Sequence, residues 1–258
     1  MIYLFLAMIR KIFLEAKFYL FNTLSYIITL YLIFLLVFTG TKFLIMGGES
    51  LASSVPIEDF IIGFMIWGST IDAYSLLAQS LFVEARLGTL EQLYMIPFGF
   101  ECVATAMILA NFIYSFIIQG ILLILMMLTT GRFLHIDLIS IIPLWFVTIL
   151  GVYGLGFAIA GISLIYKRVQ ASYQIMQFLF AFLITLPIQR HPILKFLPLG
   201  NGYNLIKYVM GSGERLWNLP IKNLLILIIS SLFYLAFGYI IYKIFEDKAR
   251  DIGALAHY

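Results

Sequence analysis

The stretch LWFVTILGVYGLGFAIAGISLIY, residues Leu144–Tyr166, contains no Asp, Glu, Lys or Arg. A helix that crosses the hydrocarbon core of a bilayer needs about 20 mostly apolar residues, and this stretch meets that length. Lys167 and Arg168 follow it directly and end the apolar run. The stretch therefore predicts a membrane-spanning helix with a pair of cations at one membrane surface.

The composition of the whole chain is that of a membrane protein. Of its 258 residues, 63% are hydrophobic and 11% are charged, and the mean hydropathy is +1.04. Soluble domains are about 45–50% apolar and about 25% charged, so a soluble fold would have too little polar surface to cover itself. The net charge of +3 and the lack of a basic run give no support for a nucleic-acid partner. We expect an all-α, polytopic bundle in contact with membrane lipids.

Six apolar stretches are expected to form one transmembrane domain over residues 1–258. An amphipathic helix at 1–20, with charged residues on one face, is expected to lie in the interface before the first span. The third stretch exceeds the length of a straight span, so we expect it to be tilted or broken. The six expected spans cover residues 22–38, 57–83, 98–130, 144–166, 169–186 and 222–244.

Residues 187–221, between the fifth and sixth expected spans, are apolar but rich in proline and glycine. Proline and glycine break helices into short pieces. Non-helical backbone at membrane depth must be buried in protein or face water. We therefore expect short re-entrant helices that dip into the outer leaflet. If the chain has six spans and a cytoplasmic N-terminus, nine Lys and Arg residues lie inside and seven lie outside. This small excess is weak evidence for the orientation.

Motifs for catalysis or metal binding are absent from the sequence. There is no phosphate-binding loop GxxxxGK[ST] and no GxSxG nucleophile motif. His135, His191 and His257 have no ligand spacing, and Cys102 is the single cysteine. We expect this chain to have no catalytic residue and to bind no metal or cofactor itself.

Asp72 is the most unusual polar residue within an apolar stretch. Ser75 and Gln79 follow it, and Gln79 lies two helical turns further along the same face. A carboxylate at the bilayer centre costs roughly 2.5–3.5 kcal/mol on insertion scales, so Asp72 should face the bundle interior or a wet cavity. Two interpretations remain open: Asp72 lines a substrate path, or it pins helices together. Other amides also lie in apolar stretches: Asn111, Gln119, Gln174 and Gln177.

Residues 84–93 read EARLGTLEQL, and Pro97 follows. Leu87, Leu90 and Leu93 form one apolar face, whereas Glu84 and Glu91 share another face. A helix that merely rests on lipid headgroups would carry Lys and Arg on its polar face. The acidic face predicts contact with a protein partner at the cytoplasmic surface.

This motif resembles the coupling helix, here residues 84–97, of ABC-2 type permeases, the membrane subunits of bacterial and archaeal ABC exporters with the type V fold. The amphipathic start at 1–20 is similar to the interfacial helix of that family. Residues 187–221 are similar to its external re-entrant helices, and the tail EDKARDIG at 246–253 is similar to its cytoplasmic end. The residues before Glu84 are apolar, whereas the family often has further charges there.

The resemblance implies a permease without an ATPase site of its own, in the cell membrane, with both termini cytoplasmic. Two cytoplasmic ATPase subunits, which bind ATP and Mg²⁺, would dock on two permease copies that form a homodimer. The implied ATPase contact consists of Glu84, Arg86, Leu87, Gly88, Thr89, Leu90, Glu91 and Gln92. The implied substrate path includes Asp72, Ser75, Gln79, Tyr173, Gln174 and Gln177.

The sequence leaves the substrate open, because drugs, lipids and glycans are all exported by this architecture. Two other classes of function remain as alternatives. A membrane-embedded enzyme acting on lipid would need clustered acidic or histidine residues at the membrane face, and Asp72 stands alone in the interior of its apolar stretch. An ion-coupled carrier or channel commonly has broken helices in both halves, whereas only residues 187–221 are broken here.

Overall fold

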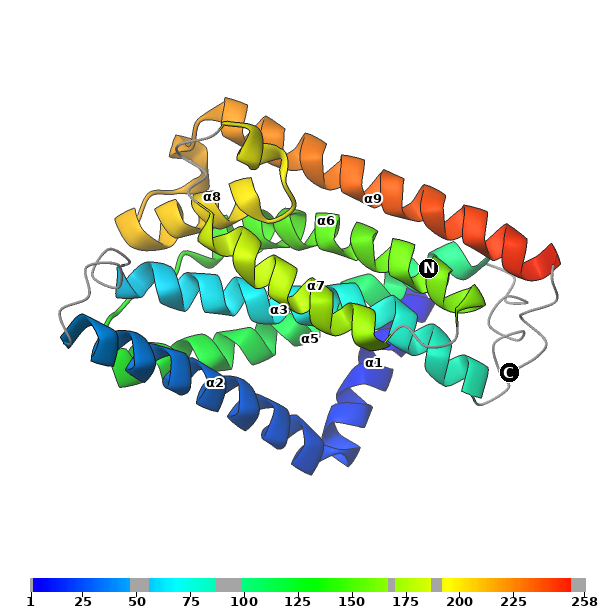
Figure 1. Ribbon diagram of the computed structural model, residues 1–258, viewed down its shortest axis with the longest axis horizontal. Coiled ribbons are helices and arrows are strands. Elements are labelled where there is room, and N and C mark those ends of the chain that lie inside the picture. The colour runs from blue at the N-terminus through cyan, green and yellow to red at the C-terminus, as the bar shows by residue number, and fades with distance from the viewer. Residues whose placement is uncertain (1, 47–55, 87–98, 167–169, 187–191, 252–258) are drawn as a thin grey trace.

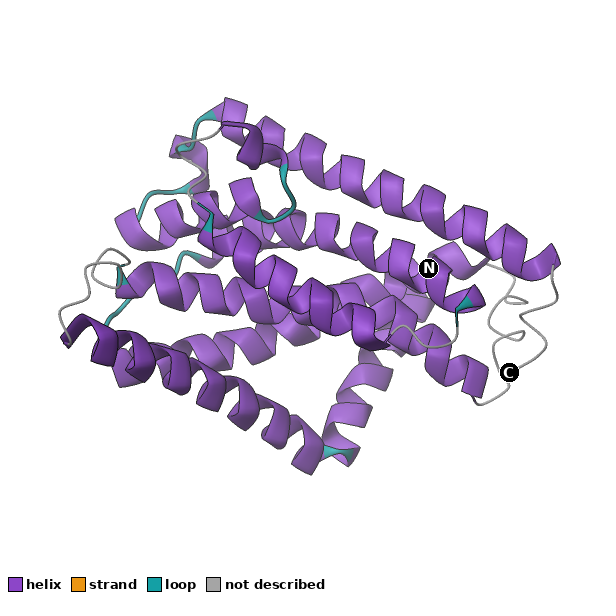
Figure 2. Cartoon of the chain, viewed as in Figure 1, coloured by secondary structure: helices purple, strands orange, loops and turns teal. Residues whose placement is uncertain are grey.

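The computed structural model describes residues 2–46, 56–86, 99–166, 170–186 and 192–251, and this part of the chain is helical without a strand (Figure 2). The all-α expectation is therefore confirmed for the described residues. Two short 3-10 helices, η2 (Pro192–Phe196) and η3 (Leu216–Asn218), flank α8. The α-helices are α1 (Ile2–Phe18), α2 (Leu20–Met46), α3 (Ile57–Arg86), α5 (Gly99–Thr130), α6 (Leu138–Ile165), α7 (Gln170–Thr185), α8 (Gly200–Ser212) and α9 (Ile221–Asp251).

Five of the described helices are long and apolar enough to cross a membrane, which indicates a multi-pass membrane protein. They lie side by side in an elongated bundle (Figure 1). α7 is apolar but has only 16 residues, which is about 24 Å at 1.5 Å per residue, somewhat less than a hydrocarbon core of about 30 Å. The five candidate spans are Leu20–Thr41, Ile57–Glu84, Gly99–Thr130, Leu138–Ile165 and Ile221–Asp251.

α3 and α6 form the centre of the bundle, and α2 and α9 lie on opposite sides of it (Figure 1). Most residues of α3 and α6 are buried, whereas α2 and α9 leave long apolar faces exposed. On α2 the exposed face has a spacing of four residues, as one side of a helix requires: Leu24, Ile28, Leu32 and Leu36. Apolar faces of this extent are suited to contact with lipid.

Small residues allow α6 and α9 to pack with their backbones in contact. A Cβ placed on Gly161 would lie 2.7 Å from the Cα of Tyr242, and one placed on Gly151 would lie 3.3 Å from the Cα of Ser231. A Cβ on Gly238 would overlap the backbone of Gly154, and a Cβ on Gly154 would overlap the backbone of Tyr234 and Leu235. Small residues serve this purpose in membrane bundles. The glycines of α6 are therefore explained by helix packing.

α1 turns steeply away from α2 at Tyr19 and lies against α5 (Figure 1). The ring of Phe13 meets the ring of Tyr114 edge to face, with centroids 6.2 Å apart. The charged face of α1 bears Arg10 and Lys11, both exposed. This division into a packed apolar side and an exposed charged side agrees with the amphipathic pattern of residues 1–20.

Several helix boundaries differ from those expected from hydropathy. α5 is one unbroken helix of 32 residues, so of the two alternatives expected for the third span, a tilt and a break, the break does not occur. α6 begins at Leu138 and contains Pro143; a proline removes only one backbone donor, and its neighbours in a membrane bundle tolerate this loss. α9 continues past residue 244 to Asp251. Ion pairs between Glu246 and the flanking Lys243 and Arg250 favour the extension.

Residues 192–220 form short helices, as the proline and glycine pattern predicted, and α8 is the longest of them. α8 lies directly against α6, because a Cβ on Gly202 would overlap the side chain of Thr148. Backbone contacts fix its other end, since the His135 N–H donates to the carbonyl of Met210 at 2.9 Å. α8 and its flanking 3-10 helices are thereby held at one end of the bundle.

Candidate functional site

Asp72 joins three helices near the middle of the bundle. It lies halfway along α3 and is half-buried. The hydroxyl of Tyr26, on α2, donates to its Oδ1 atom at 2.7 Å. The hydroxyl of Ser115, on α5, donates to its Oδ2 atom at 3.0 Å. Both carboxylate oxygens are therefore engaged by side chains of neighbouring helices, which is the arrangement expected of a polar group that must be paired in a bilayer.

A row of polar side chains continues along α5 on both sides of Ser115. Asn111, Ser115 and Gln119 are spaced by four residues and share one face of the helix. Tyr153, on α6, donates to the Oδ1 atom of Asn111 at 2.9 Å. The side chain of Gln119 is fully buried against Gly68, and within the described residues its amide has no hydrogen-bond partner. The interior between α3, α5 and α6 is thus polar over more than two helical turns.

The sequence singled out Asp72, Asn111 and Gln119, but not the hydroxyls that bind Asp72 and Asn111. Tyr26, Ser115 and Tyr153 belong to residue types that are common throughout this chain, which has 16 tyrosines. Nothing in their local sequence distinguishes them from packing residues. They meet the Asp72 carboxylate and the Asn111 amide only because of how α2, α3, α5 and α6 are rotated and aligned in the bundle.

Ser75 and Gln79 lie near Asp72 along α3 but take no part in this cluster. The Ser75 hydroxyl donates to the carbonyl of Ile71 in its own helix at 2.8 Å. Gln79 is exposed, on the same face as Asp72 and nearer the carboxyl end of α3.

α7 is held against a different side of α3. The indole N–H of Trp67 donates to the carbonyl of Gln177 at 3.0 Å, and the hydroxyl of Tyr74 donates to the carbonyl of Tyr173. Gln174 is exposed, whereas the side chains of Tyr173 and Gln177 are half-buried.

The six residues of the expected path therefore do not surround one common space within the described chain. Trp67 and Tyr74 lie about 140° and 200° around the helix from Asp72, at 100° per residue. Asp72 and Gln79 face the side of α2 and α5, while Tyr173, Gln174 and Gln177 belong to a helix bound on the far side of α3. A path lined by both groups would have to pass around α3 or be completed by a second subunit.

The segment expected to contact an ATPase begins as a continuation of α3. Glu84 and Arg86 belong to the last turn of this helix, which extends three residues beyond the expected end of the span at 83. The Lys11 ammonium lies 3.9 Å from the Oε1 atom of Glu84, so that α1 and α3 meet at this end of the bundle. The remaining residues of the expected contact, Leu87, Gly88, Thr89, Leu90, Glu91 and Gln92, lie outside the described residues.

An ionic network that the sequence analysis had not anticipated links α5 and α9. The Lys243 ammonium lies 2.6 Å from the Oε1 atom of Glu101 and 2.9 Å from the Oε2 atom of Glu246. Arg250 donates to the other oxygen of Glu246 at 2.6 Å. Glu246 is only 1% exposed, and burial without such cations would be costly. The spacing of Lys243, Glu246 and Arg250 along α9 could have predicted the ion pairs within that helix. The contact with Glu101 could not be predicted, because it depends on how α5 and α9 are placed in the fold.

No group of three or more His, Cys, Asp or Glu side chains that could hold a metal ion occurs within the described ranges. Comparison of the chain with protein-family models, with curated proteins and with solved structures finds no match.

Proposed function

We propose that this chain is the transmembrane permease subunit of an ATP-driven exporter of the ABC-2 type. The observation that carries the proposal is the continuity of α3. This helix is the most buried candidate span, and it extends without interruption through Glu84 to Arg86, where the motif EARLGTLEQL begins. A force applied to that motif would be transmitted along a rigid central helix.

The polar contacts of α3 would carry such a displacement to the rest of the bundle. Asp72 is hydrogen-bonded to α2 and α5, and Trp67 and Tyr74 are hydrogen-bonded to α7. Movement of α3 would therefore be felt by three neighbouring helices. In the proposed mechanism, closure of two ATPase subunits pushes on Glu84–Leu93 in each of two permeases. The permease dimer then changes from an inward-open to an outward-open cavity.

The proposed topology has six spans, with α7 as the fifth and both termini in the cytoplasm. α7 runs antiparallel to α3, because Tyr173 meets Tyr74 whereas Ile184 lies 3.1 Å from a Cβ placed on Gly63. A helix that follows α3 over this length supports a crossing between the two ends of the bundle. α8 and the 3-10 helices then form the external segment.

The proposed substrate is amphipathic: a drug, a lipid or a glycan-type molecule. Asp72, Ser75 and Gln79 would face one part of its route, and Tyr173, Gln174 and Gln177 another. Since α3 separates the two groups in one chain, the second permease of a homodimer would complete the path. ATP and Mg²⁺ would bind to the ATPase subunits alone.

Charge reversal at the proposed ATPase contact tests the function. The full chain is affinity-purified from its host with the ATPase that accompanies it, and the complex is reconstituted in proteoliposomes. We expect Glu84→Arg and Glu91→Arg to lower ATP-dependent export at least about tenfold, the effect of losing about 1.4 kcal/mol of coupling. Glu58→Arg, the same change at the opposite end of α3 and 34% exposed there, should leave export within about twofold of the wild type.

Three results would contradict the proposal. The first is that no ATPase co-purifies with the wild-type chain. The second is that both variants keep wild-type export and substrate-stimulated ATP hydrolysis. The third is transport by the chain alone, driven by an ion gradient, which would assign it to the ion-coupled carriers.

A further inference from the structure

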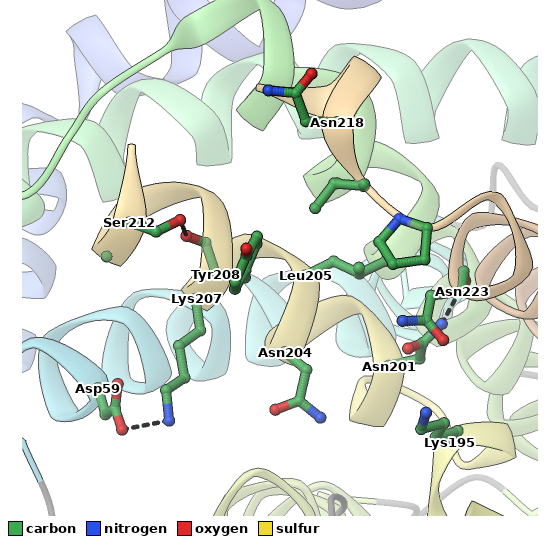
Figure 3. Close-up of a pocket in the computed structure, with 13 residues that line it drawn as sticks. Asp59, Lys195, Asn201, Asn204, Leu205, Lys207, Tyr208, Ser212, Asn218 and Asn223 are labelled. Atoms are coloured by element: carbon green, nitrogen blue, oxygen red, sulfur yellow. Dashed lines mark hydrogen bonds and ion pairs between the residues drawn. The ribbon is translucent and has the colours of Figure 1, made fainter. Parts of the chain in front are cut away.

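A cavity of about 670 Å³ lies where α8, η2, η3 and the start of α9 meet (Figure 3). Ligand pockets in proteins usually have volumes of about 300–1,000 Å³. The lining is unusually rich in amides for a protein with this composition. Four asparagines and two lysines contribute to it: Asn201, Asn204, Asn218, Asn223, Lys195 and Lys207.

Some of these polar groups are already bound within the protein. Lys207 forms an ion pair with Asp59 at the beginning of α3 (Figure 3). The Asn201 amide donates to the carbonyl of Asn223 at 2.6 Å, and the Asn218 amide donates to Glu214 at 2.6 Å. These interactions shape the wall of the cavity, and the ion pair neutralises the charges of Lys207 and Asp59 against each other.

Lys195 and Asn204 are two of the lining polar groups that remain available to a ligand, together with the side-chain amide of Asn223 and the hydroxyl of Tyr208. Across the described part of the chain, no hydrogen bond or ion pair engages the Lys195 ammonium or the Asn204 amide. With Lys207 balanced by Asp59, Lys195 gives the cavity a net positive charge. An ammonium is a compact charge suited to phosphate, and an amide can both donate to and accept from hydroxyl groups. The free groups therefore match an anionic ligand that also carries hydroxyls.

Exposed aromatic side chains around this cavity match those found at the level of lipid headgroups. Phe196, Tyr208 and Trp217 are 53%, 51% and 72% exposed. Tyr208 lines the cavity, and the other two directly adjoin the lining residues Lys195 and Asn218. Tyr and Trp are enriched where a membrane protein passes from hydrocarbon to water. The exposed apolar face of α9 begins immediately beside them, at Ile221 and Leu225.

We propose that the cavity binds the headgroup of an anionic, hydroxyl-bearing phospholipid, with its phosphate at Lys195 and its hydroxyls at Asn204. Leu205 and Leu219, which also line the cavity, would contact the glycerol and the first carbons of the acyl chains. The inference concerns lipid recognition at one end of the bundle and holds whether or not the chain couples to an ATPase.

Binding of three probes distinguishes a lipid site from a site for a soluble anion. The purified full chain, in a detergent without a sugar headgroup, is titrated with dihexanoyl phosphatidylglycerol, dihexanoyl phosphatidylcholine and glycerol 1-phosphate. The change in tryptophan fluorescence serves as the signal, since Trp217 adjoins the cavity. We expect phosphatidylglycerol to bind at least about tenfold more tightly than either other probe, because only it offers charge, hydroxyls and acyl chains together.

Variants at the free groups test the placement of the headgroup. Lys195→Gln and Asn204→Leu should each weaken phosphatidylglycerol binding about fivefold. The first variant loses one ionic contact at a partly exposed site, and the second loses one neutral hydrogen bond. Lys222→Gln is the matched control, since Lys222 is exposed at the same end of the bundle but does not line the cavity; it should change binding less than about twofold. The partly exposed Lys195 can be replaced without loss of packing, so the test does not depend on Asn204→Leu folding.

The proposal is overturned by any of three outcomes. Equal affinity for phosphatidylglycerol and phosphatidylcholine would remove the role of charge and hydroxyls. Glycerol 1-phosphate binding as tightly as phosphatidylglycerol would assign the cavity to a soluble anion. Equal effects of Lys195→Gln and Lys222→Gln would mean that the lipid responds to the overall charge of this surface and not to the cavity.

Discussion

Tyr26 donates the shorter of the two hydrogen bonds that Asp72 accepts, at 2.7 Å, and its removal reports how strongly the carboxylate holds the helices together. Hydrogen bonds between helices in membranes contribute about 0.6–2 kcal/mol. We expect Tyr26→Phe to lower the free energy of unfolding in SDS by about 1 kcal/mol. Combined with Asp72→Ala, it should cause little further loss. Tyr166→Phe, at a tyrosine that is 62% exposed, is the control. If the losses of unfolding free energy added up in the double variant, Tyr26 would contribute to stability independently of Asp72, and the prediction would be wrong.

At the scale of single residues, Asp72 can be recognised from the sequence as an unusual carboxylate, but the residues that surround it cannot. A carboxylate within an apolar stretch is conspicuous, so Asp72 could be selected, and the structure shows it engaged by Tyr26 and Ser115. These partners lie 46 and 43 residues away along the chain. Hydropathy predicts which segments are helices but carries no information on how one helix is rotated against another, and that rotation decides which hydroxyl meets the carboxylate.

Among the helices, the contact of α6 with α9 offers the sharpest test of packing. Gly238 faces the backbone of Gly154, and a Cβ there would overlap it. We expect Gly238→Ala to destabilise the protein by about 1–3 kcal/mol, the usual effect of overpacking, seen as a lower melting temperature in detergent. Gly120→Ala adds the same methyl to α5, where nothing lies within 4 Å of the new Cβ, and should leave stability unchanged or raise it by up to about 1 kcal/mol, because alanine has the higher helix propensity. An equal loss of stability in both variants would show that the α6–α9 contact does not set the outcome.

The sequence predicts the positions of the helices better than it predicts where each helix begins and ends. Each of the six expected spans corresponds to a helix, but α2, α6 and α9 extend well past the ends given by apolar composition. A helix continues where its backbone and side chains remain satisfied, and this depends on ion pairs such as those of Glu246 and not on hydropathy. The glycines of α6 are visible in the sequence, whereas the helix that packs against three of them, α9, follows from the fold alone.

For the molecule as a whole, the number of crossings depends on α7. Five helices satisfy the length and composition of a span, and α7 is the shorter apolar helix between α6 and the segment around α8. The Leu216 N–H donates to the Ser140 hydroxyl at 2.9 Å, which places Trp217 at the end of the bundle that holds the loop after α5. A crossing by α7 would explain how the chain reaches this end from Tyr166. Composition could not decide this, because a helix of 16 residues lies at the lower limit of a span.

Single-cysteine labelling measures that arrangement directly. Cys102 is first replaced by Ser, and one cysteine is then introduced at Phe133, Tyr166 or Trp217. Phe133 follows α5 and is 74% exposed, Tyr166 follows α6 and is 62% exposed, and Trp217 precedes α9 and is 72% exposed. A membrane-impermeant maleimide applied to intact cells should label Phe133→Cys and Trp217→Cys, since six spans with a cytoplasmic N-terminus place both outside. Tyr166→Cys should react only after the cells are permeabilised, which also controls for accessibility. If Phe133→Cys were labelled and Trp217→Cys were not, α7 would not cross the membrane. If only Tyr166→Cys were labelled, the topology would be inverted, and residues 84–97 would lie away from any cytoplasmic ATPase.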